Sequence, residues 1–187
     1  MEKNTQQNVN TKLSTKQLTT IGVMTAVTCI LGPLAIPLSF SPVPISLTNL
    51  AIYINIYVLG TKSGTISYIV YLLLGLVGLP IFSNFTGGLA KLAGPTGGYL
   101  IGFIFLAIVG GIFVDHFQGK IYMHAIGLVI GTAICYLFGT LWLAFQAHLT
   151  FEAALWAGVI PYIPGDIAKV VIALIIGPQL RKQIKKI

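Results

Sequence analysis

The sequence predicts an all-α integral membrane protein in which six transmembrane helices form one bundle, with the N- and C-termini both in the cytoplasm. Of the 187 residues, 56% are hydrophobic and only 8% are charged, whereas soluble domains carry roughly 25% charged residues. A soluble domain with so few charges would expose large apolar patches and aggregate. The apolar residues gather in runs long enough for helices to cross a bilayer. We therefore expect a multi-pass protein of the cell membrane, the cytoplasmic membrane of a bacterium.

A polar tail precedes six apolar runs, each of which predicts a helix. Residues 1–17 are rich in Asn, Gln and Thr and are expected to form a flexible tail. Residues 18–187 are expected to form a single six-helix transmembrane domain without an obvious internal repeat. The predicted helices cover residues 18–40, 47–60, 65–82, 97–114, 121–147 and 165–180, with a short surface helix near 151–160.

Polar turns and helix-breaking residues set the limits of these runs. The proline-rich stretch SFSPVPIS follows the first run, the charged turn TKSG follows the second, a glycine-rich loop follows the third, and DHFQGK follows the fourth. The last apolar stretch is too long for one simple span, and Pro161, Pro164 and Gly165 interrupt it. A proline removes a backbone N–H and clashes with the preceding helical turn, so the sixth helix is expected to begin near Gly165.

The basic residues predict the orientation. With a cytoplasmic N-terminus, all but two of the 11 Lys and Arg residues fall on the cytoplasmic side, which is the bias that membrane proteins show. Lys91 and Lys169 fall on the outer side, together with the connections after the first, third and fifth runs. The net charge of +7 therefore marks topology, and we expect no binding of nucleic acid.

An aspartate and a lysine lie at the start of the last run, where ionisable residues are rare and usually functional. A helix that begins near Gly165 places Asp166 and Lys169 on one face, with Asp166 favoured by the positive end of the helix dipole. One interpretation is a capping aspartate paired with its neighbour, which anchors the helix at the interface. The other is a binding site, and the glycine-rich loop on the same predicted side favours it.

The loop FSNFTGGLAKLAGPTGGYLIGF, residues 82–103, supplies further polar groups for this site. Asn84 would contribute an amide and Lys91 an ammonium, although Asn84 could instead cap the loop and Lys91 could anchor the interface. Glycines such as Gly98 let backbone approach a ligand closely, and Tyr99 beside them is expected to face the pocket. A carboxylate, an ammonium and an amide beside apolar walls are typical of a small-molecule site.

The sequence carries no motif for catalysis or nucleotide binding. Neither G-x-x-x-x-G-K-[ST] nor G-x-G-x-x-G occurs, so ATP-driven work would need partner subunits. The spacings of His116, His124 and His148 suit no metal site, and no pair of nucleophile and base stands out. We therefore expect no enzyme activity, no metal and no cofactor.

The loop and the last run together resemble the BioY family, the biotin-binding substrate-capture subunits (S components) of energy-coupling-factor (ECF) vitamin transporters. The similarity is carried by GLPIFSNFTGGLAKLAGPTGGYLIGF, YIPGDIAKVVIA and PVPISLTNL. It implies an S component that binds biotin with high affinity on its outer face. It also implies docking on a transmembrane coupling subunit served by two ATP-binding cassette ATPases. Gly22 and Ala26, whose spacing allows another helix to approach closely, occupy the positions where S components often carry Ala-x-x-x-Ala.

The chemistry of biotin fits this resemblance. Its ureido ring offers two N–H donors and one carbonyl acceptor, and Asp166, Asn84 and Lys169 supply the complementary groups. The connection after the first run would cover the ring and the valeryl chain as an apolar lid. Lys91 or backbone N–H groups of the loop would receive the carboxylate.

Two other classes of function stay open at this point. The first is a stand-alone proton-coupled secondary transporter of a small vitamin-like molecule, in which Asp166 and Lys169 would form the proton-coupled pair. Transport by the chain alone in liposomes, abolished when the proton gradient collapses, would favour it. The second is a membrane-embedded enzyme, which product formation from a labelled substrate would reveal.

Overall fold

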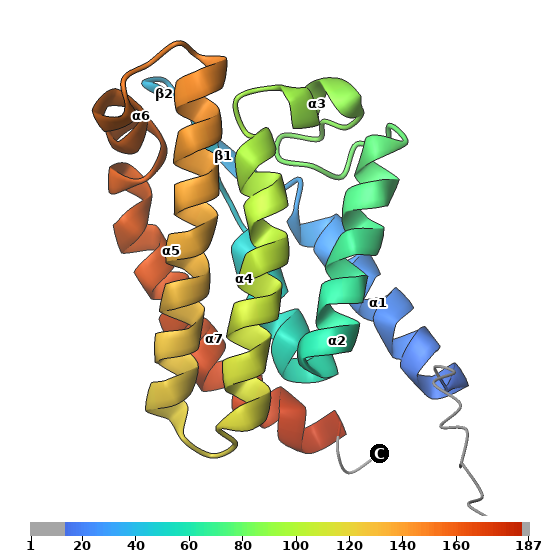
Figure 1. Cartoon of the computed structure of the whole chain (residues 1–187). Helices are drawn as coiled ribbons and strands as arrows, with labels where there is room; N and C mark the ends of the chain where they lie inside the picture. Colours follow the sequence, from blue (N-terminus) through green and yellow to red (C-terminus); the bar gives the residue numbers. More distant parts are fainter. Residues whose placement is uncertain (1–13, 185–187) are drawn as a thin grey trace, which may run out of the picture.

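The computed structural model describes residues 14–184, which form a helical bundle with a small β-hairpin (Figure 1). Most of the predicted tail, residues 1–13, lies outside this described part. The strands are β1 (Ala35–Leu38) and β2 (Ser41–Ser46). The helices are α1 (Thr15–Leu31), α2 (Thr48–Leu76), α3 (Leu89–Ala93), α4 (Gly97–His116), α5 (Ile121–Gln146), α6 (Phe151–Gly158) and α7 (Ile163–Ile184), with the 3-10 helix η1 (Ile160–Tyr162) before α7.

Helix α1 begins at a capping box. The Ser14 hydroxyl accepts a hydrogen bond from the Gln17 backbone N–H at 3.2 Å, and the Gln17 side chain accepts one from the Ser14 N–H at 3.0 Å. This arrangement satisfies two backbone donors that a helix start leaves without intrahelical partners. The apolar run begins at Leu18, and the helix therefore begins about one turn before it.

The prediction that the first helical run continues to residue 40 is wrong. Helix α1 ends at Leu31, and residues 35–46 form the antiparallel pair β1–β2, with Ala35 opposite Ser46. Pro33 and Pro37 lack the N–H group that a continuing helix needs. The fold is therefore mostly helical with a β-hairpin in its first connection, and not all-α.

Helix α2 consists of two antiparallel arms joined at Gly60. This glycine has φ 75° and ψ −177°, a conformation that residues with a Cβ rarely adopt. The arms pack together, and the Asn55 side-chain amide of the first arm donates to the Ser67 hydroxyl of the second at 3.3 Å. Asp115 of α4 closes the reversal by accepting hydrogen bonds from the Thr61 N–H and hydroxyl, each at 2.7 Å. The separate second and third runs of the sequence are thus confirmed.

Helices α4 and α5 form a closely packed pair because glycines lie between them. A Cβ placed on Gly98 would lie 2.3 Å from the Cβ of Trp142, and one placed on Gly102 would lie 2.9 Å from the Cα of Cys135. Small residues let the backbones of membrane helices approach in this way. The two contacts also fix the position of α4 along the axis of α5, so that the start of α4 lies beside the last turns of α5.

Replacing Gly98 by alanine is expected to lower the midpoint of thermal unfolding in detergent. The added methyl group would lie 2.7 Å from the Phe138 carbonyl oxygen as well as against Trp142, and such overpacking typically costs about 1–3 kcal/mol. Gly22→Ala is the matched control, because nothing lies within 4 Å of a Cβ at that position. The control measures the gain in stability, up to about 1 kcal/mol, that replacing glycine by alanine brings to a helix without any clash. Equal melting of both variants would contradict the close packing.

The connections divide between the two ends of the bundle (Figure 1). The hairpin turn, α3 and α6 lie at the upper end of the view, whereas the start of α1, the reversal at Gly60, the α4–α5 turn and the end of α7 lie at the lower end. The three connections that the sequence assigns to the outer side therefore share one end of the molecule.

Within residues 14–184, four helical stretches are long and apolar enough to cross a membrane by length and composition. They are Thr48–Leu76, Gly97–His116, Ile121–Gln146 and Phe151–Ile184. Large apolar side chains on the outer faces of these helices are exposed, for example Leu137 of α5 at 52% and Ile175 of α7 at 59%. Outward-facing apolar surface of this kind is typical of helices in lipid.

Candidate binding site

A cavity lies between the first turns of α7, the β-hairpin, the start of α2, and the faces of α4 and α5 that point toward them. Its polar centre is an ion pair on α7. The Lys169 ammonium lies 2.8 Å from one carboxylate oxygen of Asp166, and the two residues are only 8% and 9% exposed. Their spacing of three residues places both side chains on one face of the helix. A buried charge pair of this kind is costly to bury, so its position in a cavity indicates a function.

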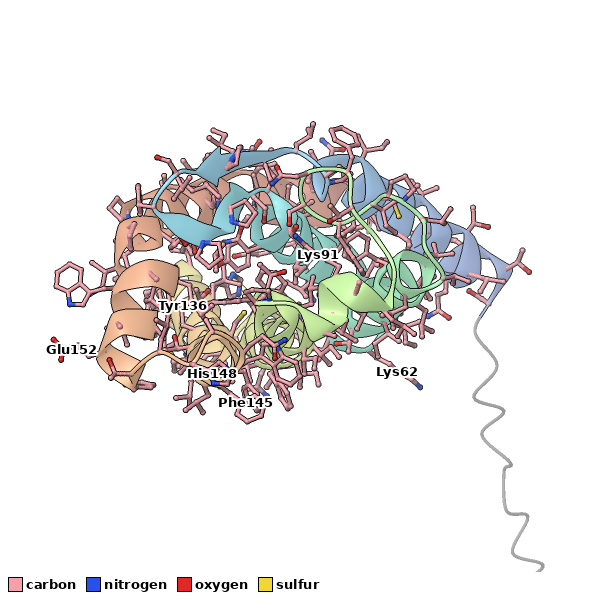
Figure 2. All side chains as sticks on the ribbon, turned by 90° about the horizontal axis from the view of Figure 1, so that it is seen from above. Lys62, Lys91, Tyr136, Phe145, His148 and Glu152 are labelled. Carbon is pink, nitrogen blue, oxygen red and sulfur yellow. The ribbon has the colours of Figure 1, made fainter. Side chains whose placement is uncertain are left out.

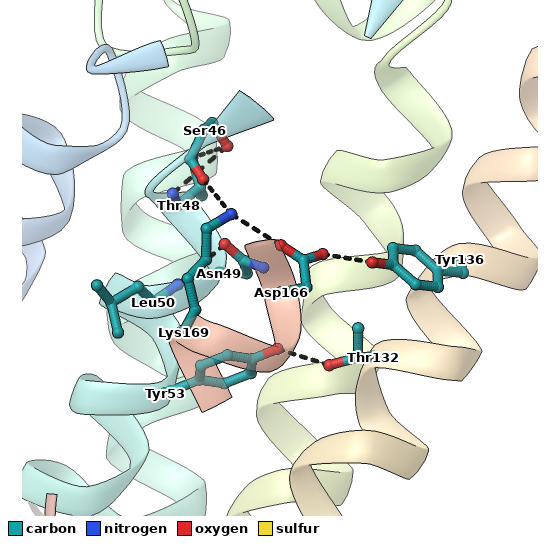
Figure 3. Close-up of polar contacts among 9 residues, drawn as sticks. All are labelled: Ser46, Thr48, Asn49, Leu50, Tyr53, Thr132, Tyr136, Asp166 and Lys169. Carbon is teal, nitrogen blue, oxygen red and sulfur yellow. Dashed lines mark hydrogen bonds and ion pairs between the residues drawn. The ribbon is translucent and has the colours of Figure 1, made fainter. Parts of the chain in front are cut away.

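The ion pair is held by a second element on each side (Figure 3). The Lys169 ammonium donates to the Ser46 carbonyl oxygen at 2.7 Å, at the end of strand β2. The Tyr136 hydroxyl of α5 donates to the other carboxylate oxygen of Asp166. Close to this pair, the Tyr53 hydroxyl of α2 is hydrogen-bonded to the Thr132 hydroxyl at 2.6 Å. Three other elements, β2, α2 and α5, therefore converge on the first turns of α7.

The β-hairpin covers the cavity and is tied to the segment between α6 and α7. The Tyr162 hydroxyl lies 2.8 Å from the Ser41 hydroxyl and also contacts the Val43 carbonyl oxygen. The Ser41 hydroxyl donates to the Ala157 carbonyl oxygen at 2.7 Å. The hairpin thus occupies the position of the apolar lid expected from the sequence, with Val43 and Pro44 in the cavity wall.

Helix α4 supplies an apolar and aromatic wall of the cavity. Tyr99, Leu100 and Phe103 line it, and their spacing is that of one helix face. The Tyr99 hydroxyl donates to the Gly158 carbonyl oxygen at 3.0 Å, and Gly158 also lines the cavity. The cavity therefore combines one buried ion pair with flat apolar surface, which suits a small molecule with a polar ring and an apolar body.

The match to a protein family agrees with this arrangement. The model of the BioY family matches residues 3–186. The chain belongs to the BioY family. Together with the four apolar helical stretches, this membership makes it a multi-pass membrane protein.

Known members of the family and a solved structure are similar to the chain over nearly its whole length. Biotin transporter BioY of Thermotoga maritima is 39% identical over 167 residues, which is 89% of this chain and 96% of the relative. Biotin transporter BioY of Lactococcus lactis subsp. cremoris is 37% identical over 174 residues, 90% of this chain and 92% of the relative. The crystal structure at 2.1 Å of the S-component for biotin from an ECF-type ABC transporter has a TM-score of 0.84, with 34% identity, 91% of this chain covered and 95% of the other.

Three of the site residues predicted for this BioY-family chain lie together and three do not. Asp166, Lys169 and Tyr99 line the cavity, whereas Asn84, Lys91 and Gly98 lie outside its lining. A Cβ at Gly98 would clash with Trp142 of α5. Close packing of the two helices therefore explains why this residue is a glycine.

Asn84 lies on the loop after α2, next to a residue of the cavity wall but outside the lining itself. Its side chain is exposed, its φ is 61°, and its backbone N–H donates to the Pro33 carbonyl oxygen at 3.0 Å. The preceding residue, Ser83, lines the cavity instead. Asparagine tolerates the left-handed conformation better than most residues, so in this structure Asn84 serves the turn.

Lys91 lies on α3, and from above it is seen near the middle of the molecule, whereas Lys62 and Glu152 lie at its margin (Figure 2). Partial burial lowers the pKa of Lys91 below its ordinary value, because burial disfavours the charged form. The residues predicted for docking, Gly22 and Ala26, lie on α1 and are both exposed.

Sequence reasoning missed the hydroxyl groups that support the ion pair. Thr132 and Tyr136 are four residues apart on α5 and share one helix face, so two hydroxyls recurring at helical spacing in an apolar run were an available signal. The contact of Lys169 with the Ser46 carbonyl oxygen involves a backbone group and leaves no trace in the sequence.

Proposed function

We propose that this chain is the high-affinity biotin-binding S component of an ECF-type transporter, which captures biotin at the extracellular side and delivers it to the cytoplasm with a coupling module. The observation that carries the proposal is the buried pair of Asp166 and Lys169 in a cavity covered by the β-hairpin. The BioY family is a family of transporters, so the chain is not an enzyme.

The ion pair matches the ureido ring of biotin group by group. A carboxylate has about four lone-pair positions, so Asp166 keeps acceptor capacity for the ring N–H groups while it holds Lys169 and Tyr136. The Lys169 ammonium has three donors and uses two in the contacts with Asp166 and Ser46, which leaves one for the ring carbonyl. Tyr99 and its neighbours on α4 would contact the apolar part of the ligand.

The roles of Asn84, Lys91 and Gly98 in binding stay predictions. Asn84 follows a residue of the cavity wall, Ser83, so a modest change of the loop would bring its amide to the ligand. Lys91 would attract an anionic ligand to the upper end of the bundle. Gly98 would act indirectly, by fixing how close α4 lies to α5.

We propose six membrane crossings with both termini in the cytoplasm. The crossings are α1, the two arms of α2, α4, α5 and α7. The reversal of α2, the α4–α5 turn and the end of α7 lie at the end of the bundle opposite to the hairpin, α3 and α6. These segments carry Lys62, Lys120, Arg181 and Lys182, which supports a cytoplasmic position for that end. The cavity then opens toward the extracellular side, and residues 18–184 behave as a single membrane domain.

Binding to purified chain tests the function directly. The chain alone, in detergent, is titrated calorimetrically with biotin, thiamine and riboflavin. Tight binding of biotin with no measurable heat from the other two is the expected result. Binding of a different vitamin, or of none, would refute the proposal.

Docking on the partner subunits is proposed to use the exposed face of α1. The chain has no nucleotide-binding motif, so the ATP-dependent step belongs to a transmembrane coupling subunit and two ATP-binding cassette ATPases. Replacing Gly22 by phenylalanine is expected to reduce co-purification with these partners by about tenfold, the equivalent of about 1.4 kcal/mol, because helices joined through small residues pack closely. Biotin binding by the isolated variant should be unchanged.

A lipid-facing position supplies the control for this docking experiment. Val129 on α5 is 56% exposed, and Val129→Phe adds similar bulk away from α1. Equal co-purification of both variants with the coupling subunit and ATPases would place the docking surface elsewhere on the chain.

A further inference from the structure

We infer that a groove between α5 and α7 binds one anionic phospholipid of the cytoplasmic leaflet, with its phosphate at Arg181 and Lys182 and an acyl chain between the two helices. The inference goes beyond the proposed function and makes no use of biotin; it uses only the orientation proposed above. It assigns an occupant to two cavities that the binding of a vitamin leaves unexplained.

The first of these cavities is basic and lies beside the α4–α5 turn, at the lower end of the bundle in Figure 1. It has a volume of about 290 Å³, and Arg181 and Lys182 of α7 line it. Ile121 of α5 and Pro178 of α7 add apolar surface to its wall. Basic pockets between membrane helices on the cytoplasmic side bind the head groups of anionic lipids. This cavity therefore suits a phosphate that carries an apolar chain.

The positive charge of the basic cavity is only partly compensated. Arg181 pairs with the Asp115 carboxylate at 2.6 Å and contacts the Val114 carbonyl oxygen at 3.5 Å. A guanidinium has five N–H donors, so donors of Arg181 remain for an anion. Within residues 14–184, no carboxylate lies within ion-pair distance of the Lys182 ammonium. A phosphate group would supply the missing negative charge.

The second cavity is apolar and continues the basic one along the same faces of α5 and α7. It has a volume of about 500 Å³. Residues that line the two cavities recur every three or four positions, which keeps their side chains on one face of each helix. They are Ile121, Ala125 and Val129 of α5, and Val171, Leu174, Pro178 and Lys182 of α7. The two cavities therefore follow one another along a single α5–α7 groove.

The groove is open to the bilayer and has the length of one leaflet. Val129 and Val171 are 56% and 48% exposed, so an acyl chain can enter between the helices from the side. One leaflet contributes about 15 Å of a hydrocarbon core of about 30 Å, which is about ten residues of helix at 1.5 Å per residue. A chain that begins near Pro178 therefore ends near Ile167, which also lines the groove. The bound lipid would hold the end of α7 at the cytoplasmic surface.

The test measures the lipid that the purified full-length chain retains. Delipidated chain in detergent is mixed with dioleoyl phosphatidylglycerol, or with dioleoyl phosphatidylcholine, which has the same chains but no net charge. Native mass spectrometry counts the bound molecules. We expect one molecule of phosphatidylglycerol to be retained in preference to phosphatidylcholine, and the midpoint of thermal unfolding to rise with phosphatidylglycerol.

Two variants test the two parts of the groove. Lys182→Gln is expected to weaken the retention of phosphatidylglycerol by about fivefold, or about 1 kcal/mol, the contribution of one basic residue near an anionic lipid surface. Ala125→Phe fills the groove and should weaken retention by at least as much. The controls should behave as the wild type. Lys16→Gln removes the same charge from an exposed position on α1, and Leu137→Phe places a phenyl ring on α5 outside the groove.

Four results would overturn the inference. Equal retention of the two lipids would remove the role of charge. Unchanged retention in Lys182→Gln or in Ala125→Phe would take the lipid out of the groove. Equal losses in Lys182→Gln and Lys16→Gln would mean that phosphatidylglycerol responds to the overall charge of the chain. Stabilisation by inorganic phosphate as large as that by phosphatidylglycerol would assign the basic cavity to a free anion. Failure to bind biotin would refute the proposed function and leave this inference unchanged.

Discussion

Asp166→Asn is expected to weaken biotin binding by more than tenfold while the protein stays folded in detergent. Asparagine keeps the shape of the side chain but replaces a charged acceptor with an amide, and a hydrogen bond to a charged group contributes about 1.5–3 kcal/mol. Lys169 would also lose the counter-ion that lies 2.8 Å away. Calorimetric titration with biotin measures the change, and size-exclusion chromatography verifies the fold.

Another ion pair within residues 14–184 provides a matched control. Asp115 of α4 lies 2.6 Å from the guanidinium of Arg181, at the end of the bundle away from the cavity. Asp115→Asn removes the same charge from a similar pair and should leave the affinity for biotin unchanged. Comparable loss in both variants would mean that Asp166 acts through general stability and not through the ligand.

Lys169→Ala is expected to have an effect of similar size on biotin binding, for two reasons. It removes the donor proposed for the ring carbonyl, and it leaves the buried Asp166 carboxylate without its partner. It also breaks the hydrogen bond of 2.7 Å to the Ser46 carbonyl oxygen, so the hairpin over the cavity should become easier to open. Amide hydrogen exchange of residues 35–46 in the ligand-free protein would report this loosening.

Lys182→Ala serves as the control for Lys169→Ala, because Lys182 lies exposed at the other end of α7. The double variant Asp166→Asn with Lys169→Ala measures the coupling between the two side chains. If they act on the ligand as one unit, the double variant should lose about as much affinity as either single variant. Simple addition of the two losses, or unchanged affinity in Lys169→Ala, would contradict a joint site.

Long apolar runs made most helices predictable from the sequence. The expected runs 97–114 and 121–147 differ from α4 and α5 by no more than about two residues, which is the usual uncertainty of helix ends. The hairpin was not predictable in the same way. Pro33 and Pro37 indicate that a helix cannot continue. They do not indicate the pairing of β1 with β2 or the contacts of β2 with Tyr162 of η1 and Lys169 of α7.

The polar part of the site was predictable only where charges stand out. Asp166 and Lys169 are conspicuous because ionisable residues are rare in apolar helices. Tyr136 and Thr132 are not, since tyrosine and threonine occur in many apolar runs and the partners of these two, Asp166 and Tyr53, come from distant elements. Asn84 also stands out in the sequence, but it lies in a turn with a positive φ, and its part in binding stays a prediction.

The reversal at Gly60 makes the first arm of α2 short, with consequences for the cavity. Residues 48–59 form a helix only about 18 Å long at 1.5 Å per residue, against a hydrocarbon thickness of about 30 Å. The hairpin and the cavity occupy the depth that this arm does not reach. Ala51, Ile52 and Tyr53 of this arm are fully buried, so neighbouring elements of the protein and not lipid enclose it. Hydrophobic mismatch arises where a helix contacts lipid, so it does not set the length of this arm. An enclosed helix can therefore be short enough to leave room for a binding cavity within the membrane.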